Sequence, residues 1–270
     1  MRLAWPARAS LAVLALVLLL ALAGPALSPW HVEQLDWLRM AAAPGADGAH
    51  WLGTDRLGRD LFVRTLAGVR VSLAIAGLAT LVSLVLGVGY GAVAGYAGGR
   101  LDALMMRLVD VLYSLPYVFF VILLTVVLDR RPTTVFLAIG AVGWLTMARV
   151  VRGETRRLRQ REFIEAAIAT GVPAPAILWR HVLPNLAGPV VVYATLTVPG
   201  LIILESFLSF LGLGVQEPAA SLGNLLAQGA QEMEVAPWML LVPCGFLVAT
   251  VLALAFLGEG LRDALDPHGR

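Results

Sequence analysis

An apolar chain of 270 residues carries one long polar interruption, over residues 149–185, where it must meet something soluble. Strong helix formers occupy residues 162–169, and Gly171 follows where a left-handed residue can end a helix. Alanines leave a slim face that can enter a cleft in another protein, while Phe163 and Ile164 add apolar contact. The pattern predicts a helix that docks on a partner; an ordinary surface helix is the alternative. The predicted docking residues are Glu162, Phe163, Glu165, Ala166, Ala167, Gly171, His181, Leu183, Pro184 and Asn185.

A second polar segment, over residues 50–60, is dense in Gly, Asp and Arg. Such a mixture predicts a tight, hydrogen-bonded turn that leads into a short amphipathic helix before the second apolar run. The segment could be a surface for a solute-delivery protein or a structural lid on a helix bundle, and we favour the lid. The residues of interest are Gly53, Thr54, Asp55, Gly58, Arg59 and Asp60.

One acid, Glu205, lies well inside an apolar run, with Ser206 and Ser209 close to it. An acid within a bilayer costs about 2.5–3.5 kcal/mol unless it faces a polar cavity or a partner. The three residues therefore either line a translocation path or bond neighbouring helices, and the sequence leaves both interpretations open. Another acid, Asp110, has Arg107 three residues before it, which predicts a paired structural charge.

No pattern in the chain predicts an enzyme. All twenty basic residues are Arg, so the lysine that a phosphate-binding P-loop requires is missing. The histidines show no metal-ligand spacing, and no G-x-S-x-G nucleophile motif occurs. The string at residues 87–91 resembles a potassium filter, but glycines at 87, 91 and 95 within a long apolar run indicate close helix packing instead. We expect no catalytic residue, metal or cofactor.

The elements that position these residues are membrane helices. The chain is 59% hydrophobic and 14% charged, against about 45–50% and 25% in soluble domains. Several runs are continuously apolar and long enough, at roughly 17–25 residues, to cross a hydrocarbon core as helices. Prolines inside them, such as Pro116, predict kinks. The six expected spans cover residues 11–27, 71–97, 104–128, 133–148, 188–211 and 238–257.

Arginine placement predicts the orientation of these six spans. Thirteen of the twenty arginines fall on the side that holds both termini and residues 149–184. An excess of positive residues marks the cytoplasmic face, so the docking segment and the termini are expected there. The arginines lie in loops between spans, which argues against a nucleic-acid surface despite the net charge of +2.

Taken together, these motifs resemble the C-type permeases of bacterial ATP-driven oligopeptide and dipeptide importers, over nearly the whole chain. Residues 233–238 resemble the oligopeptide members more than the dipeptide members. One departure is the proline-rich stretch at 172–175, which is expected to shift the start of a second docking helix. The segments that carry the resemblance are residues 52–60, 95–116, 148–154, 162–185, 205–218 and 258–267.

The resemblance implies an all-α membrane protein with six transmembrane helices, of the type I importer permease fold. It implies an N-terminal helix and extracytoplasmic segment over residues 1–70 and a core permease domain over 71–270, with the cytosolic coupling loop at 149–187. The implied partners are a homologous B-type permease in a heterodimer, two cytosolic ATP-binding subunits, an extracytoplasmic solute-binding protein and membrane lipid. The implied location is the bacterial inner membrane.

Some alternatives stay open beside the resemblance. Residues 1–27 also look like a cleavable signal peptide with a mature start at Gly24, although the resemblance favours a retained helix. The cargo implied is oligopeptides, with dipeptides, nickel or another small solute as the alternative. A stand-alone secondary transporter or channel is the competing class, but the chain shows no clear internal repeat.

Overall fold

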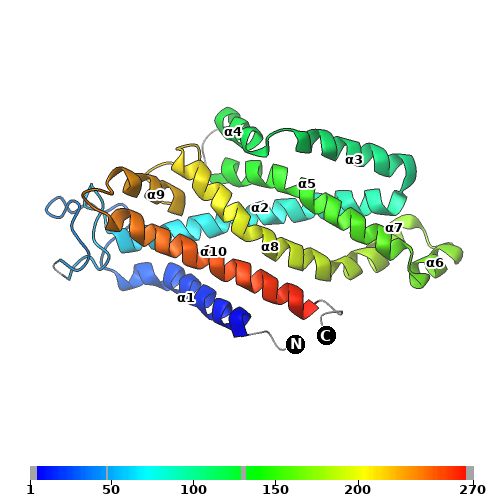
Figure 1. Ribbon diagram of the computed structural model, residues 1–270, viewed down its shortest axis with the longest axis horizontal. Helices are drawn as coiled ribbons and strands as arrows, with labels where there is room; N and C mark the ends of the chain where they lie inside the picture. The colour runs from blue at the N-terminus through cyan, green and yellow to red at the C-terminus, as the bar shows by residue number, and fades with distance from the viewer. Residues whose placement is uncertain (1–4, 47, 129–131, 266–270) are drawn as a thin grey trace.

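The structure is a computed structural model that describes residues 5–46, 48–128 and 132–265. Its long helices run roughly side by side along the longest axis of the molecule (Figure 1). The arginines at 2, 130, 131 and 270 and the histidine at 268, used above for orientation and metal spacing, lie outside the described residues. The elements are α1 (Trp5–Leu27), α2 (Leu61–Ala97), α3 (Gly99–Ser114), α4 (Tyr117–Leu128), α5 (Pro132–Arg159), α6 (Glu162–Ala169), α7 (Ala174–Ile177), the π-helical turn η1 (Leu178–Val182), α8 (Leu183–Phe210), α9 (Leu222–Gln231) and α10 (Trp238–Leu265).

The described chain holds five helices that are long and apolar enough to cross a membrane, or six if one bent pair counts as a single span. The bent pair is α3 with α4, whose axes differ by 81°. The expected third span, 104–128, is therefore broken rather than straight. The break has a local cause: Leu115 has φ −73° and ψ 138°, the extended conformation that a following proline, Pro116, imposes.

Two helices extend well beyond the apolar runs that predicted them. The second helix, α2, begins at Leu61 because the Asp60 carboxylate caps it, accepting a hydrogen bond from the Val63 N–H at 2.9 Å. The domain boundary expected after residue 70 therefore falls inside α2. Likewise α5 continues to Arg159, past the expected end at Ala148. Hydropathy marks where a helix lies in lipid, whereas the helix itself continues into polar residues.

The first helix is part of the bundle. Its buried residues recur every three or four positions, which gives one continuous face. That face packs on α10 and α2, and a Cβ at Gly24 would collide with the Leu66 side chain. The buried positions are Ala7, Ser10, Leu14, Val17, Ala21 and Gly24.

The most closely packed pair of long helices is α2 with α5. A Cβ added at Gly91 would collide with the Ala148 carbonyl oxygen, and one at Gly95 would lie 2.6 Å from the carbonyl oxygen of Arg152. Gly87 meets the Met147 side chain in the same way. The prediction that these glycines serve close helix packing is confirmed.

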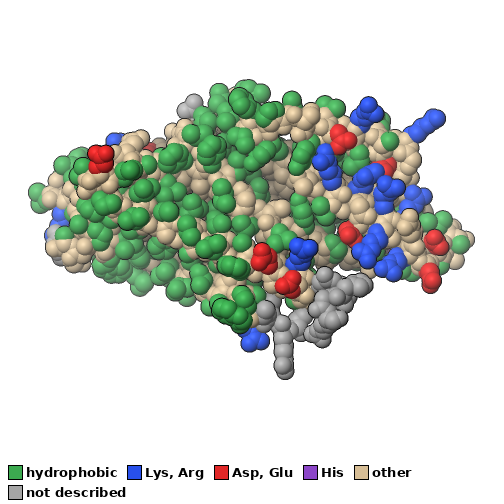
Figure 2. Space-filling model, in the orientation of Figure 1, with side chains coloured by type: hydrophobic (Ala, Val, Ile, Leu, Met, Phe, Trp, Pro, Cys, Tyr) green, Lys and Arg blue, Asp and Glu red, His purple; other side chains and the backbone are tan. Residues whose placement is uncertain are grey.

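The two ends of the bundle differ in chemistry. One end carries α6, α7 and the turn between α2 and α3, and the N-terminal end of α1 and the C-terminal end of α10 point the same way (Figure 1). The other end carries α9 and the segment before α2. On the visible face, apolar side chains cover the middle while arginines gather toward the α6 end (Figure 2). The docking segment therefore lies at the end of the bundle toward which the first described residues of α1 and the last described residues of α10 point (Figure 1).

Candidate functional site

The predicted docking helix is α6, and it ends as the sequence indicated. Gly171 has φ +77°, and its N–H donates to the Ile168 carbonyl at 3.0 Å. The N–H of Val172 donates to the Ala167 carbonyl at 3.1 Å. These two bonds form the Schellman motif, which fixes where the helix stops.

The helix α6 has a buried face and an exposed face. Ile164 and Ala167 are buried against a cluster that includes Val182 and Leu186. Two predictions are wrong here: Ile164 and Ala167 do not offer contact to a partner, because they anchor α6 to its own bundle. The exposed residues that remain available to a partner are Glu162, Phe163, Glu165 and Ala166.

The second half of the docking motif lies beside the first. The ring centroids of Phe163 and His181 are 6.4 Å apart. The turn η1 leads from α7 into α8, and the Leu183 N–H bonds to the Leu178 carbonyl five residues earlier. Pro184 follows directly and has no N–H to give, which suits this local widening of the helix. The helix that follows α6 is α7, which starts at Ala174 with Pro173 as its N-cap residue.

At the opposite end, residues 50–60 form a hydrogen-bonded lid. The Asp55 carboxylate accepts from the Arg59 Nε at 2.6 Å and lies 3.4 Å from the Arg64 Nε, and all three side chains are buried. Arg59 also donates to Glu217 at 3.1 Å, which ties the lid to the segment before α9. The Thr54 carbonyl accepts from Trp238 at 3.3 Å, which ties it to α10.

A second buried group completes the lid. His50 Nδ1 lies 2.8 Å from the Asp60 carboxylate, and its ring stacks on Trp30 at 4.3 Å. Gly58 has φ +77°, and a Cβ there would collide with the Asp36 backbone. Gly53 also has a positive φ, +79°. Because most of the motif's side chains are turned inward, the geometry supports the favoured interpretation of a structural lid.

Glu205 is fully buried among hydroxyl groups. Ser72 of α2 donates to it at 2.6 Å, Ser209 donates at 2.8 Å, and Ser206 lies at 3.5 Å. Ser72 in turn accepts from the Leu222 N–H at the start of α9, at 3.3 Å. In this structure Glu205, Ser206 and Ser209 join α2, α8 and α9 and do not line the cavity described below. Of the two interpretations left open, bonding between helices fits these contacts.

Two ion pairs hold α3 on α5. Asp102 accepts from the Nε and NH2 groups of Arg152 at 2.5 and 2.7 Å, a bidentate pair that is partly buried. Asp110 pairs with Arg149 at 2.7 Å on the surface. Asp110 is thus a paired charge as predicted, but its partner comes from α5 and not from Arg107.

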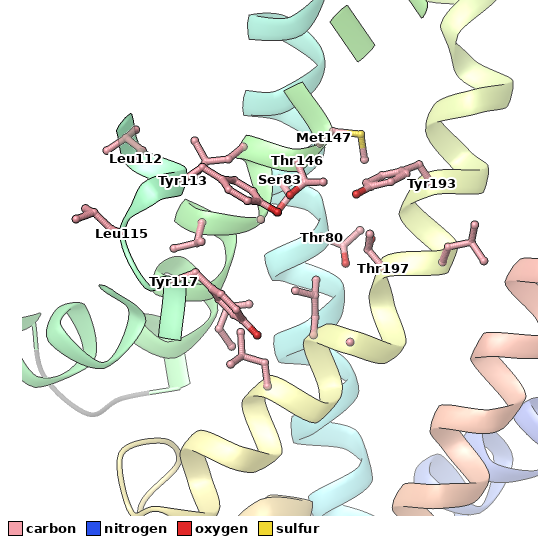
Figure 3. Close-up of a pocket in the computed structure, with 18 of the residues that line it drawn as sticks. Thr80, Ser83, Leu112, Tyr113, Leu115, Tyr117, Thr146, Met147, Tyr193 and Thr197 are labelled. Atoms are coloured by element: carbon pink, nitrogen blue, oxygen red, sulfur yellow. The ribbon is translucent and has the colours of Figure 1, made fainter. Parts of the chain in front are cut away.

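The bend between α3 and α4 opens onto a cavity of about 600 Å³ that the sequence did not reveal. Tyr113 and Tyr193 enter it from α3 and α8, with Ser83 and Thr146 in the same space (Figure 3). The sequence gives only a weak indication of this cavity, because an isolated hydroxyl side chain in an apolar helix usually hydrogen-bonds to a carbonyl of its own helix. The hydroxyl-bearing residues that line the cavity are Thr80, Ser83, Tyr113, Ser114, Tyr117, Thr146, Tyr193 and Thr197.

Comparison with known proteins identifies the family. The family model described as "Binding-protein-dependent transport system inner membrane component" matches residues 87–270. The chain is 52% identical over 262 residues to the oligopeptide transport system permease protein OppC of Escherichia coli, covering 97% of this chain and 87% of that protein. The protein of the same name from Haemophilus influenzae is 50% identical, with coverages of 97% and 84%. The dipeptide transport system permease protein DppC of Bacillus subtilis is 44% identical, with coverages of 98% and 82%.

Solved structures agree at the level of the fold. An inward-facing structure of the MetNI methionine ABC transporter matches with a TM-score of 0.58 and 21% identity, covering 76% of this chain and 96% of that one. The fold is therefore that of an ABC importer's transmembrane subunit, and the resemblance drawn from the motifs is confirmed. A transport component of this kind is not itself a catalyst. The chain belongs to the binding-protein-dependent transport system inner membrane components, as a multi-pass permease subunit of the C type.

Proposed function

We propose that this chain is one transmembrane subunit of an ATP-driven importer that carries oligopeptides across the bacterial inner membrane. The observation that carries the proposal is α6, an exposed rod whose buried face, Ile164 and Ala167, is fixed to the transmembrane core. The names of the relatives at 50% and 52% identity support the cargo.

The chain has an exposed docking helix and no lysine for a P-loop, so the proposed partners supply the remaining steps of transport. Two cytosolic ATP-binding subunits supply hydrolysis, a B-type permease supplies the other half of the membrane path, and an extracytoplasmic protein delivers solute. Both termini and α6 face the cytoplasm, because most of the arginines lie on their side. Residues 1–70 form an N-terminal helix and extracytoplasmic segment, and residues 71–270 form the core permease domain.

Coupling runs through α6. The exposed residues Glu162, Phe163 and Glu165 contact an ATP-binding subunit, together with Gly171 and the segment from His181 to Asn185. Since the buried face of α6 packs with α5, η1 and α8, a displacement of the rod moves those helices with it. ATP can bias the two states of the path only through contacts that differ between them, and α6 offers such contacts.

The outer lid has a supporting role. Gly53, Thr54, Asp55, Gly58, Arg59 and Asp60 hold the segment before α2 in place, so a delivery protein meets other side chains. Trp37 and Leu38 are 64% and 95% exposed on the same segment and are available for that contact.

Uptake by purified protein tests the proposal. The complete complex and the isolated chain are each placed in proteoliposomes with labelled tri-alanine and ATP. We expect ATP-dependent uptake by the complex alone. Uptake by the isolated chain, or ATP hydrolysis by the complex without peptide uptake, would refute the proposed function.

Dipeptides are the second candidate cargo, because the DppC protein of Bacillus subtilis is 44% identical to this chain. A competition experiment distinguishes an oligopeptide carrier from a dipeptide carrier. Unlabelled di-alanine and unlabelled penta-alanine are added to the same assay at equal concentration, and stronger competition by penta-alanine indicates an oligopeptide carrier.

A further inference from the structure

The cavity between α2, α3, α5 and α8 combines hydroxyl groups with an uncharged lining. None of the described residues that line it is Asp, Glu, Lys, Arg or His. Its volume of about 600 Å³ falls within the range of roughly 300–1,000 Å³ that is usual for small-ligand sites. Such a site recognises its ligand through hydrogen bonds and shape rather than through charge.

The hydroxyls in this cavity can both accept and donate. Ser83 and Thr197 give their hydrogens to the Ala79 and Ala194 carbonyls of their own helices, at 2.9 Å each. Their oxygens keep a lone pair for an incoming N–H group. Tyr113 adds a phenol group, which can donate to a carbonyl, while Tyr193 and Thr146 add hydroxyls that hydrogen-bond to each other and keep further hydrogen-bonding capacity.

An ion pair close to the cavity is not part of its lining. The Arg149 guanidinium lies 4.2 Å from the centroid of the Tyr113 ring, and Asp110 pairs with it at 2.7 Å. Neither member of this ion pair lines the cavity, and the cation–π contact steadies the Tyr113 ring that does. A charged group in the wall would instead attract cargo of one sign and repel the other.

We propose that the hydroxyl cluster of Ser83, Tyr113, Thr146, Tyr193 and Thr197 binds the main chain of a peptide in transit. Every peptide residue except proline presents one N–H and one C=O, whatever its side chain, so this chemistry is indifferent to sequence. The uncharged wall makes passage indifferent to side-chain charge. This inference rests on the proposed function and assigns the site on this chain that holds the cargo.

A helix of the partner permease is a poorer occupant. A transmembrane helix satisfies its main-chain groups internally, so it would offer no N–H groups to the remaining lone pairs of Ser83 and Thr197 and no free carbonyl to the Tyr113 phenol. A peptide brings unpaired N–H and C=O groups that need them.

A charge placed in the cavity tests the inference. We compare Thr197→Asp with Thr197→Asn, a neutral change of similar size, in the complete complex with one delivery protein. ATP-driven uptake of Ala-Glu-Ala and Ala-Lys-Ala is measured in proteoliposomes. Thr197→Asp should lower the Glu-to-Lys uptake ratio about tenfold relative to Thr197→Asn, since like charges repel across a weakly screened site. Equal ratios in the two variants would overturn the inference.

Removal of hydroxyls gives a second, independent measurement, which decides the matter if Thr197→Asp fails to insert. Tyr193→Phe and Thr146→Val should lower uptake of both peptides and of tri-alanine by the same factor, about fivefold for each lost hydrogen bond. The control is Thr195→Val on the same helix, whose hydroxyl bonds the Val192 carbonyl at 2.8 Å outside the cavity. Unchanged uptake in Tyr193→Phe and Thr146→Val, or a change confined to one peptide, would overturn the inference.

The two proposals fail in different ways. If the wild-type complex hydrolyses ATP and moves none of these peptides, the proposed function fails and the inference falls with it. If the wild type moves all of them and the variants behave like their controls, only the assignment of the cavity fails.

Discussion

Glu165 lies on the exposed face of α6, so its charge can be reversed without disturbing the buried anchor. We predict that Glu165→Lys inserts normally but lowers ATP-driven uptake about tenfold, because a reversed charge at a docking surface disfavours the complex. The control is Glu259→Lys, an exposed reversal on α10. Membrane abundance, ATP hydrolysis and uptake are measured together, and normal uptake by Glu165→Lys would refute the docking role.

Gly171, just after the end of α6, tolerates fewer substitutions than Glu165 because of its backbone conformation. Its φ of +77° is inaccessible to proline, whose ring fixes φ near −65°. Gly171→Pro must therefore rebuild the end of α6 and should also uncouple uptake from hydrolysis, whereas Gly171→Asn, which tolerates a left-handed backbone, should retain most uptake. Equal uptake by the two variants would show that the shape of this helix end does not matter for coupling.

Glu205 shows what a single buried acid contributes. Ser72 and Ser209 accept from the backbone N–H groups of Leu222 and Val215, so their own hydrogens are directed at the carboxylate. We predict that Glu205→Gln lowers the free energy of unfolding by about 1–3 kcal/mol, because the new amide group adds donors where donors already point. Ser206→Ala, which loses only a contact of 3.5 Å, should change it little. Thermal unfolding in detergent measures both, and equal stability of Glu205→Gln and the wild type would contradict the bonding role.

At the scale of elements, α3 packs on both α2 and α5, and ion pairs with α5 add to that packing. We predict that Asp102→Asn lowers the stability by about 3–5 kcal/mol, because it leaves Arg152 partly buried without its partner. Asp110→Asn should cost at most about 1 kcal/mol, because the Arg149 pair is exposed. Detergent unfolding curves of the two variants provide the comparison, and equal losses would show that burial does not set the strength of these pairs.

Elements that depend on local sequence were the ones that could be predicted. The limits of α6 follow from its helix formers and from Gly171, and the close packing of α2 follows from its glycine spacing, although the spacing does not say that α5 is the partner. The 81° break could not be predicted, because hydropathy records composition and not direction. The role of Glu205 could not be chosen either, since Ser72 reaches it from a helix 133 residues away in the sequence.

The sequence did not predict the cavity either, because the residues that line it lie far apart in the chain. Ser83, Thr146 and Tyr193 belong to three helices, and none of them is unusual within its own segment. Only the bundle brings them together.

At the scale of the whole molecule, apolar side chains close the cavity toward the lid. Leu201 and Leu204 line the cavity and also pack on a buried apolar cluster that includes Ile139, Leu208 and Val215. Cargo can pass between lid and cavity only if these side chains separate. The force for that separation has to arrive from the opposite end, where α6 is fixed to the ends of α5 and α8.

The source of that force must be another chain, and nucleotide labelling can show it. This sequence has no lysine, and a P-loop cannot hold the β- and γ-phosphates of ATP without one. We predict that a photoreactive ATP analogue labels the ATP-binding subunits of the purified complex at saturable sites and leaves this chain unlabelled, both within the complex and alone. An excess of unlabelled ATP is the control for specific labelling. Saturable labelling of this chain would mean that it binds the nucleotide itself, and α6 would then no longer be needed to bring the energy of hydrolysis to the membrane path.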